Sequence, residues 1–244
     1  MTRLLTYDPR TVARDIPGIF ESIFPQLTPG VVAHLNRSAK ATEYEPVPLE
    51  MVQQSTMQQA MLFELGYAVA EELLRERVID WDACLQLAAR RQKEHFDAKI
   101  PVEISKLERE IAMRVGGNLA SMCKDLARER EQKICLSPKI PGLQWIASGH
   151  GDFSAETTLI EVKCSRRNFI AADYRQLTIY WLLSFAASIE TNCIEWNEGV
   201  LLNPRSATYV SLQFDELLHT TSAGRTKVEI LQLFNSLIGT RDSA

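Results

Sequence analysis

The chain has 244 residues, of which 45% are hydrophobic and 24% charged, and its formal net charge is −4. This composition is ordinary for a globular protein and sufficient to bury a substantial core, as one domain with a large insertion or as two small domains. No apolar run approaches the roughly 18 residues that a membrane span requires, and the negative net charge argues mildly against a non-specific nucleic-acid binder.

The cysteines and the N-terminal residues indicate a cytoplasmic protein without membrane attachment. The five cysteines are scattered, with no CxxC pair, and we expect them to be reduced thiols. The opening segment MTRLLTYDPR contains no apolar stretch of the kind that a signal peptide needs.

Residues 1–48 are expected to form short helices, because prolines interrupt the segment repeatedly. Thr28-Pro29 is a typical helix start, since proline is tolerated in the first turn, and apolar residues follow it at helical spacing. We interpret the region as a helical cap on the rest of the chain. A docking arm or a nucleic-acid contact is the alternative.

Two longer helices are predicted next. Apolar residues recur at steps of three and four from Leu49 to about Arg77, and a second helix runs from Asp80, a plausible N-cap, to about Phe96. Pro101 marks a break. The predicted organisation is therefore a helical N-terminal region at residues 1–100 and a second unit at residues 101–244.

A long amphipathic helix over Glu103–Glu131 opens the second unit, with an apolar stripe that begins at Leu107. Gly116-Gly117 weakens this helix in the middle and marks either a close backbone approach or a kink. The charged run at its start contains Glu108 and Glu110, which return below.

Strands and a further helix follow in the order that defines the fold. Strands are predicted in Lys133–Ile146, Ser148–Phe153 and Thr157–Cys164, then a buried helix over Asn168–Ser188. Gly199–Leu202 and Thr208–Leu212 read as a hairpin around a turn-rich segment, and a helix over Lys227–Ile238 ends the chain. The predicted fold class is α/β, with an αβββαββ mixed-sheet core after a helical N-terminal region.

Charged residues lie inside the most apolar of these strands. Side chains alternate along a strand, so Glu161 and Lys163 share one face, whereas Ile160 and Val162 take the other. A buried carboxylate and ammonium are costly unless each has a partner, and a divalent metal would be such a partner for Glu161. Asp152, which follows two nearby glycines, is far enough upstream for a hairpin to return it beside Glu161.

The helix after this strand carries a polar stripe. Asp173, Gln176, Tyr180 and Ser184 follow one another at steps of three and four on an otherwise apolar helix. A helix this apolar is expected to be buried, so its polar stripe should face a site or a water-filled groove.

Gly151-Asp152, Glu161-x-Lys163 and Gln176-x-x-x-Tyr180, in this order, resemble the PD-(D/E)XK nuclease superfamily. The last motif is similar to the Q-x-x-x-Y signature of its RecB-like and exonuclease-like branch, and Gly-Asp replaces the usual Pro-Asp. The resemblance covers roughly residues 103–215 and implies a restriction-endonuclease-like core. Each motif alone has an ordinary explanation, and their order and context carry the resemblance.

The resemblance implies a metal mechanism. Asp152 and Glu161 would hold Mg²⁺ (or Mn²⁺), with the Val162 carbonyl as a further oxygen ligand and Lys163 orienting water or stabilising charge. Members of the family often supply another carboxylate from the helix before the sheet, for which Glu108 and Glu110 are the candidates and Glu110 is favoured. The residues expected to support the site or contact DNA are Gln176, Tyr180, Arg166, Arg167 and Arg175.

The expected function is a Mg²⁺-dependent deoxyribonuclease acting as the effector subunit of a bacterial anti-phage (antiviral defence) or restriction-like system. A DNA-repair or recombination nuclease is the alternative enzyme. A nuclease-like scaffold or DNA-binding subunit of a larger complex is the alternative of another class. The expected partners are DNA and either another protein or a second copy of the chain, because the negative net charge suggests that a partner supplies part of the DNA-binding surface.

Overall fold

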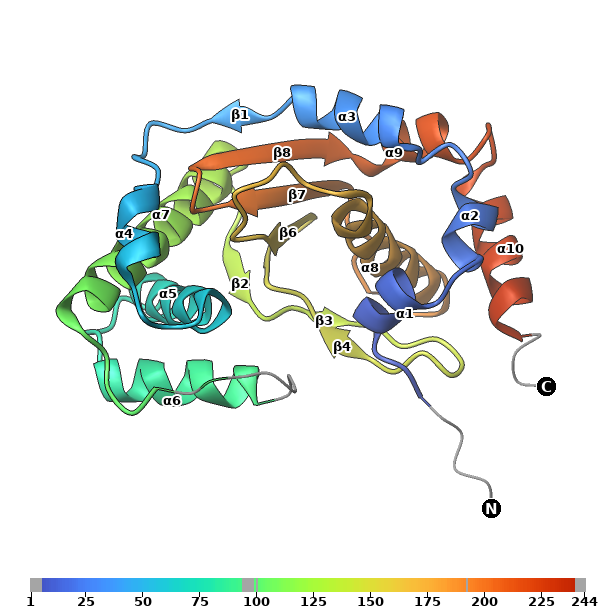
Figure 1. Cartoon of the computed structure of the whole chain (residues 1–244). Coiled ribbons are helices and arrows are strands. Elements are labelled where there is room, and N and C mark those ends of the chain that lie inside the picture. The colour runs from blue at the N-terminus through green and yellow to red at the C-terminus, as the bar shows by residue number, and fades with distance from the viewer. Residues whose placement is uncertain (1–5, 94–98, 100, 192, 240–244) are drawn as a thin grey trace, which may run out of the picture.

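The computed structural model describes residues 6–93, 99, 101–191 and 193–239, and shows an α/β protein with a helical N-terminal region followed by a mixed sheet interleaved with helices (Figure 1). The helices are α1 (Pro9–Asp15), α2 (Ile19–Ile23), α3 (Pro29–Arg37), α4 (Leu49–Gln54), α5 (Gln59–Leu74), α6 (Trp81–Gln92), α7 (Lys106–Glu129), α8 (Ala171–Glu190), α9 (Phe214–Thr221) and α10 (Lys227–Gly239). The strands are β1 (Lys40–Ala41), β2 (Ile134–Leu136), β3 (Lys139–Ile140), β4 (Gly149–His150), β5 (Phe153–Ala155), β6 (Thr158–Val162), β7 (Glu198–Asn203) and β8 (Thr208–Gln213).

The main sheet has six strands in the order β1-β8-β7-β6-β5-β2. Strands β6 and β7 are parallel and are joined by the crossover helix α8, whereas the other neighbouring pairs of this sheet are antiparallel. Strands β3 and β4 form a separate short hairpin. The α7-β2-β5-β6-α8-β7-β8 order agrees with the predicted αβββαββ arrangement. The predicted bounds of the first two strands were wrong, because Lys133–Ile146 contains both β2 and β3, and Ser148–Phe153 contains β4, which pairs with β3, while the core strand β5 begins only at Phe153.

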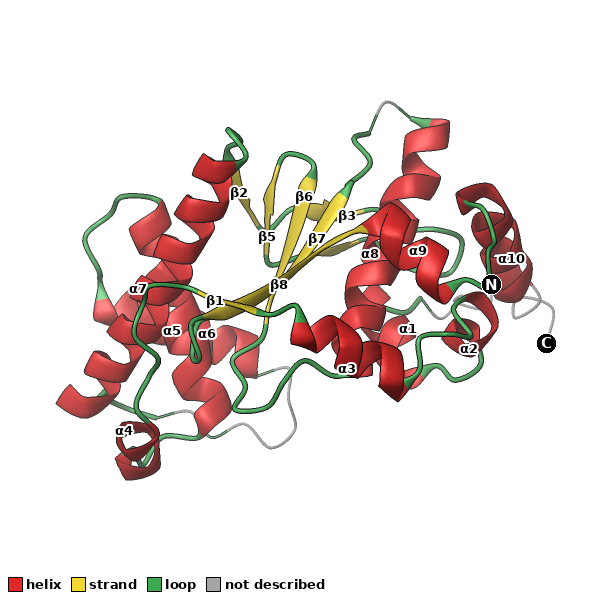
Figure 2. Ribbon diagram, turned by 90° about the horizontal axis from the view of Figure 1, so that it is seen from above, coloured by secondary structure: helices red, strands yellow, loops and turns green. Residues whose placement is uncertain are grey.

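Helices cover both faces of the sheet, as the view from above shows (Figure 2). On one face, Leu159 and Leu201 are buried in the cluster that contains the apolar residues of α8. On the other, Ile160 and Val200 are buried with Leu119 and its neighbours on α7. Adjacent residues of β6 therefore serve opposite cores, as side-chain alternation along a strand requires.

The N-terminal helices are packed into these same cores. Val12 of α1 and Phe20 of α2 are buried with the residues of α8, and β1 pairs with β8 at the edge of the sheet. This packing agrees with the interpretation of residues 1–48 as a cap. The predicted boundary at residue 100, and the predicted end of the second helix at Phe96, lie outside the described residues.

The helix predicted over Leu49–Arg77 is instead two helices, α4 and α5, and the reason is a distant carboxylate. Glu108 of α7 accepts hydrogen bonds from the Ser55 and Thr56 hydroxyls and from the Met57 N–H, at 3.2, 3.4 and 3.1 Å. These bonds stabilise the non-helical link. The same carboxylate accepts the Ser105 N–H at 2.8 Å and so caps α7.

Helices α5 and α7 are in backbone contact through two glycines. A Cβ placed on Gly116 would lie 2.6 Å from Val69 Cγ1 and 2.8 Å from the Gly66 carbonyl oxygen. One placed on Gly66 would lie 2.7 Å from Val115 Cγ1. The expectation of a close backbone approach at Gly116-Gly117 is confirmed for Gly116, whereas Gly117 faces open space.

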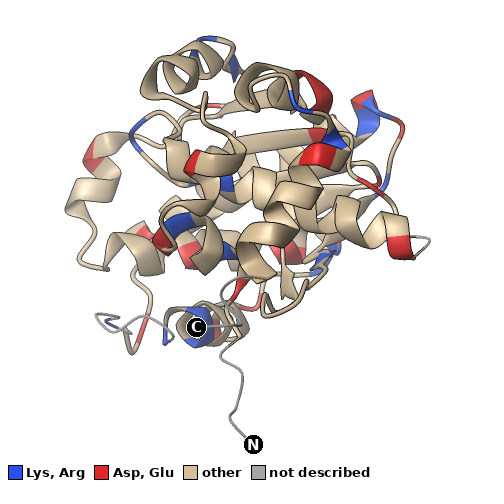
Figure 3. Cartoon of the chain, turned by 90° about the vertical axis from the view of Figure 1, so that its right-hand side faces the viewer, with Lys and Arg blue, Asp and Glu red and all other residues tan. Residues whose placement is uncertain are grey.

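The surface carries both signs of charge. Figure 3 shows basic and acidic segments interspersed over the side of the molecule that it presents. Within the described residues, none of the helices is both long and apolar enough to span a membrane.

Candidate active site

The hairpin formed by β5 and β6 brings Asp152 to Glu161, as predicted. Phe153 pairs with Ile160, so Asp152, one residue before β5, lies level with the end of β6. Its Oδ2 accepts a hydrogen bond from the Val162 N–H at 2.7 Å. The side chain is thereby fixed next to the residue that follows Glu161.

Glu161 and Lys163 share one face of β6, as the alternation predicts, and both reach α8. The Lys163 Nζ donates to Glu161 Oε1 at 2.7 Å and to Gln176 Oε1 at 3.0 Å. Lys163 Nζ also lies 4.0 Å from Asp173 Oδ1 at the start of α8. The ammonium is therefore held among polar oxygens inside a largely apolar layer.

Gln176 connects the strand with Tyr180. Its Nε2 donates to Glu161 Oε1 at 2.5 Å and to the Tyr180 hydroxyl at 3.0 Å. Gln176 is 1% exposed, and Tyr180 is buried with it. The two residues of the Q-x-x-x-Y motif therefore support Glu161 and Lys163 from the next element, as expected for positions one helical turn apart.

The positive charges near Asp152 and Glu161 do not fully compensate the two carboxylates. Burial, and then the charge of Glu161, raise the pKa of Asp152 to about 7, although Lys163, the Val162 N–H and Arg10 act in the opposite direction. Glu161 is 1% exposed, and its Oε2 has no hydrogen-bond donor. A carboxylate pair that is buried at Glu161 and partly buried at Asp152, with one unpartnered oxygen, is the arrangement that a bound cation stabilises.

A divalent cation here would have two protein carboxylates. Among the described residues, no group of three or more His, Cys, Asp or Glu side chains is gathered closely enough to hold a metal. Mg²⁺ is commonly bound by one or two carboxylates together with waters and substrate phosphate oxygens, so two are enough for it. The donor set fits a hard cation better than zinc, which prefers several His or Cys ligands.

Arg10 and Glu64, which were not predicted, join the site from the N-terminal region. Both line a cavity of about 480 Å³ that also contains Asp152, Val162 and Cys164. Burial opposes the charge on Arg10, yet the acidic neighbours Glu161 and Asp152 raise the pKa of its guanidinium. Arg10 comes from α1 and Glu64 from α5, so no local spacing connects either residue with the motifs.

Two residues predicted for the site lie elsewhere. Glu110 is exposed, and it precedes the cavity-lining Leu119 by nine positions, about 180° around the helix, so it is on the opposite side of α7. Arg175 pairs with Glu21 of α2 at 2.9 Å and its guanidinium carbon lies 6.0 Å from the centre of the Phe20 ring. The structure therefore gives Arg175 a role in holding α2 against α8.

Arg166 and Arg167 lie in the exposed turn that follows β6. The Arg167 N–H donates to the Ser165 hydroxyl at 2.9 Å, which fixes the turn backbone. Both guanidinium groups are on the surface beyond Lys163, and a phosphate role for them stays a prediction.

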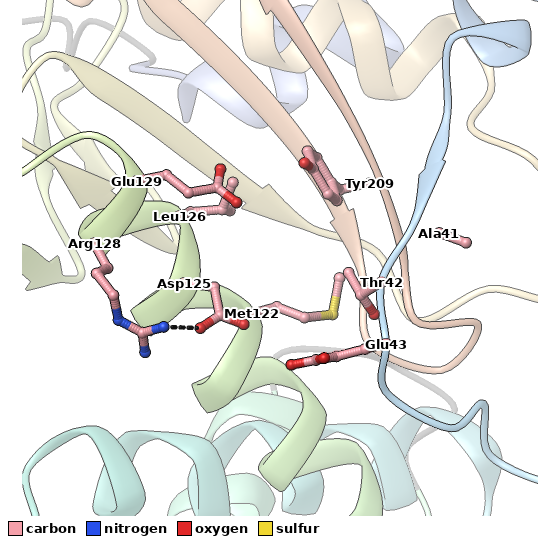
Figure 4. A pocket seen from close by; sticks show the side chains of 9 residues that line it. All are labelled: Ala41, Thr42, Glu43, Met122, Asp125, Leu126, Arg128, Glu129 and Tyr209. Atoms are coloured by element: carbon pink, nitrogen blue, oxygen red, sulfur yellow. Dashed lines mark ion pairs between the residues drawn. The ribbon is translucent and has the colours of Figure 1, made fainter.

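A second cavity, of about 470 Å³, lies between the C-terminal half of α7 and the β1–β8 edge (Figure 4). Its lining includes Glu43, Glu129 and Tyr209, and Asp125 pairs with Arg128 at 3.1 Å. None of the residues predicted for the site lines it. The cavity beside Asp152 is therefore the one that contains predicted site residues.

Gln176→Ala is expected to lower cleavage about 10- to 100-fold, because the variant removes hydrogen bonds that orient Glu161 and Lys163. Metal affinity should fall by less than when a carboxylate is removed. Turnover measured at saturating metal, together with metal titration by calorimetry, checks this. Thr178→Ala, on the same helix and buried, is the matched control, and equal activity in both variants would contradict the role.

Neither the models of known protein families nor the curated proteins give a match to this chain.

Proposed function

We propose that the protein is a Mg²⁺-dependent nuclease that hydrolyses phosphodiester bonds in DNA. One observation carries the proposal: Glu161, buried and with an unpartnered carboxylate oxygen, is held by the Lys163 ammonium next to Asp152, and Asp152 lines a polar cavity. Phosphodiester hydrolysis needs a metal site, a cation for the developing charge and an open space for the strand, and all three requirements match features of this site.

Each residue has a defined part in this chemistry. Asp152 and Glu161 would hold Mg²⁺ (or Mn²⁺), with the Val162 carbonyl as a third protein oxygen. When bound, the metal supplies a more acidic water and neutralises charge on the phosphate. Lys163 holds a positive charge next to Glu161 and stabilises charge on the phosphate oxygens. Gln176 forms hydrogen bonds with both Lys163 and Glu161 and so holds their side chains in position.

Arg10 adds a second cation, on the cavity side of the carboxylates. A guanidinium there can form paired hydrogen bonds with two phosphate oxygens, which an ammonium cannot do. Glu64 lines the same cavity and lies 4.0 Å from Arg91, but it is not grouped with Asp152 and Glu161 closely enough to be a third metal carboxylate. The N-terminal region is thus part of the proposed active site.

A purely structural role for these residues is less consistent with their burial. Glu161 is 1% exposed and Lys163 is half-buried. A scaffold does not need such an ion pair, because replacing a buried ion pair with apolar residues is often neutral or stabilising. The pair is most simply explained by chemistry that requires it.

Purified protein incubated with linear, circular and single-stranded DNA is expected to cleave with Mg²⁺ or Mn²⁺ and to stop in excess EDTA. Gel electrophoresis of the products measures both. Glu161→Gln, prepared identically, controls for a contaminating nuclease and should be inactive. Persistence of cleavage in EDTA, or equal cleavage by the Glu161→Gln preparation, would exclude the proposed mechanism.

A further inference from the structure

The cavity beside Asp152 has an aromatic wall that the hydrolytic chemistry does not require. Phe63 and Tyr67, one turn apart on α5, line it opposite Val162 and Asp152. Both rings are only partly buried. Aromatic side chains at the edge of a polar cavity are the usual platform for stacking a flat ligand.

Tyr67 and Phe63 differ in the groups that already stack on their rings. Tyr67 stacks on Phe153 with ring centres 5.1 Å apart, and the Arg91 guanidinium carbon lies 4.8 Å from the Tyr67 ring centre. For Phe63, the one stacking group found in the described part of the chain is Arg205, 5.1 Å from the ring centre. Phe63 also packs against the apolar cluster that contains Leu62 and Leu65, and its exposed part lines the cavity, where no other ring among the described residues stacks on it.

Arg205 is unusual in its own right. It is 5% exposed, its Nη2 meets no hydrogen-bond acceptor, and no carboxylate is among the residues described as interacting with its side chain. Burial and the nearby Arg166 both lower the pKa of its guanidinium. Its observed contact is with Phe63, so it fixes the orientation of that ring from within the protein.

The cavity also gathers arginine and histidine side chains that can donate hydrogen bonds to a phosphate. Arg10 of α1, Arg91 of α6 and His150 of β4 all line it, from three segments remote in the sequence. Arg91 is tied to Glu71 through Nη2 at 2.6 Å and approaches Glu64 at 4.0 Å, yet its buried Nη1 forms no hydrogen bond. Aromatic and cationic groups in one cavity match the base and the phosphate of a nucleotide.

The size of the cavity limits what can enter. A volume of about 480 Å³ falls within the range of cavities that hold one small ligand, so one nucleotide fits and a base pair within a double helix does not. A duplex would have to open before a strand reached Asp152, at the cost of unpairing and unstacking.

We propose that this cavity binds one unpaired nucleotide of the DNA strand, with its base on Phe63 and its phosphate among Arg10, Arg91 and His150. The substrate is then single-stranded DNA or a single-stranded end. This inference rests on the proposed nuclease function for its biological meaning, but the binding itself is independent of hydrolysis.

The test measures binding without cleavage. Fluorescence anisotropy in EDTA compares a labelled single-stranded oligonucleotide, its blunt duplex, an abasic strand with the same phosphates, and the RNA of the same sequence. We expect the wild type to bind the strand at least tenfold more tightly than the duplex. Phe63→Leu should raise the strand Kd about 5- to 150-fold, as expected for the loss of one stacked base.

The abasic strand makes the assignment specific. For the wild type, the Kd of the abasic strand should exceed that of the normal strand by the same factor by which Phe63→Leu raises the Kd of the normal strand. In Phe63→Leu, removing the bases should raise the Kd little further. Tyr209→Leu is the matched control, since Tyr209 is a partly buried ring that lines the other cavity beneath Lys40. Thermal melts verify folding, and the wild-type comparison of normal and abasic strands needs no variant.

The outcomes separate the two proposals. If Phe63→Leu binds the strand as tightly as the wild type, or if the wild type binds normal and abasic strands equally, the nucleotide subsite is overturned. Cleavage observed in the same preparations would still support the proposed nuclease. Phe63-dependent strand binding without any cleavage would support the subsite and remove the nuclease. Tighter binding of the RNA strand would assign the subsite to RNA and overturn DNA as its ligand.

Discussion

Asp152→Asn is expected to reduce cleavage by about 10³-fold or more, because the loss of one of two protein carboxylates removes several kcal/mol of metal-dependent stabilisation. The Asn side chain retains an oxygen that can accept the Val162 N–H, so the hairpin geometry should be preserved. Single-turnover cleavage at saturating DNA measures the loss. Asp125→Asn, at the other cavity, is the control, and near-wild-type rates in Asp152→Asn would refute the site.

The same variant has a second signature in the metal-free protein. The pKa of Asp152 is raised from 3.8 to about 7, so the folded state binds more protons than the unfolded state between these values. Stability is therefore lost as the pH rises through this window, and the full penalty is present above pH 7. In EDTA, Asp152→Asn should match the wild type near pH 4 and melt at a higher temperature at pH 8. Parallel melting curves at every pH would contradict this assignment.

Lys163→Met is expected to lower cleavage about 10²- to 10³-fold, the usual cost of removing one group that stabilises transition-state charge. It should also destabilise the metal-free protein by about 3–5 kcal/mol, because Glu161 is left buried without its ammonium partner. Chemical denaturation and single-turnover kinetics measure the two effects separately.

The double variant Lys163→Met/Glu161→Gln tests the cause of the stability loss. Neutralising Glu161 removes the uncompensated charge and should restore most of the stability, while activity stays absent because Glu161 is itself a proposed metal ligand. A double variant as unstable as Lys163→Met would show that the buried charge of Glu161 is not the cause.

The residues that the sequence located correctly are close in the chain. Asp152, Glu161 and Lys163 belong to one hairpin, and Gln176 and Tyr180 to the next helix, so strand alternation and helical spacing are enough to bring them together. Both periodicities are local properties, which explains why these positions could be predicted without a fold.

The residues that were missed depend on packing between distant segments. Arg10 reaches the cavity because α1 packs on α8, and Phe63 and Glu64 reach it because α5 packs on α7. In the sequence, Arg10 follows a proline and Glu64 lies in an ordinary helix. The wrong choice of Glu110 has a related cause, since its charged run did not reveal which face of α7 would be buried.

The order of strands and most helices along the chain could be predicted from periodicity, whereas errors arose where tertiary contacts decide. The link between α4 and α5 is held by Glu108, about fifty positions away in the chain, and no local signal marks it. Helix α9 begins one residue after β8 and was not predicted, because its short apolar pattern merges with that of the strand.

The glycine contact between α5 and α7 sets the dimensions of the proposed nucleotide cavity. Where backbones touch, neither helix can approach further, and an added methyl group at Gly66 or Gly116 would push them apart. Of the residues that line the cavity, Phe63 and Glu64 lie on α5, while Val115 and Leu119 lie on α7. The two glycines thus determine the spacing of α5 and α7 beside the cavity. A change in the size of the accepted substrate would therefore have to come from side chains that line the cavity, while the spacing of the helices stayed constant.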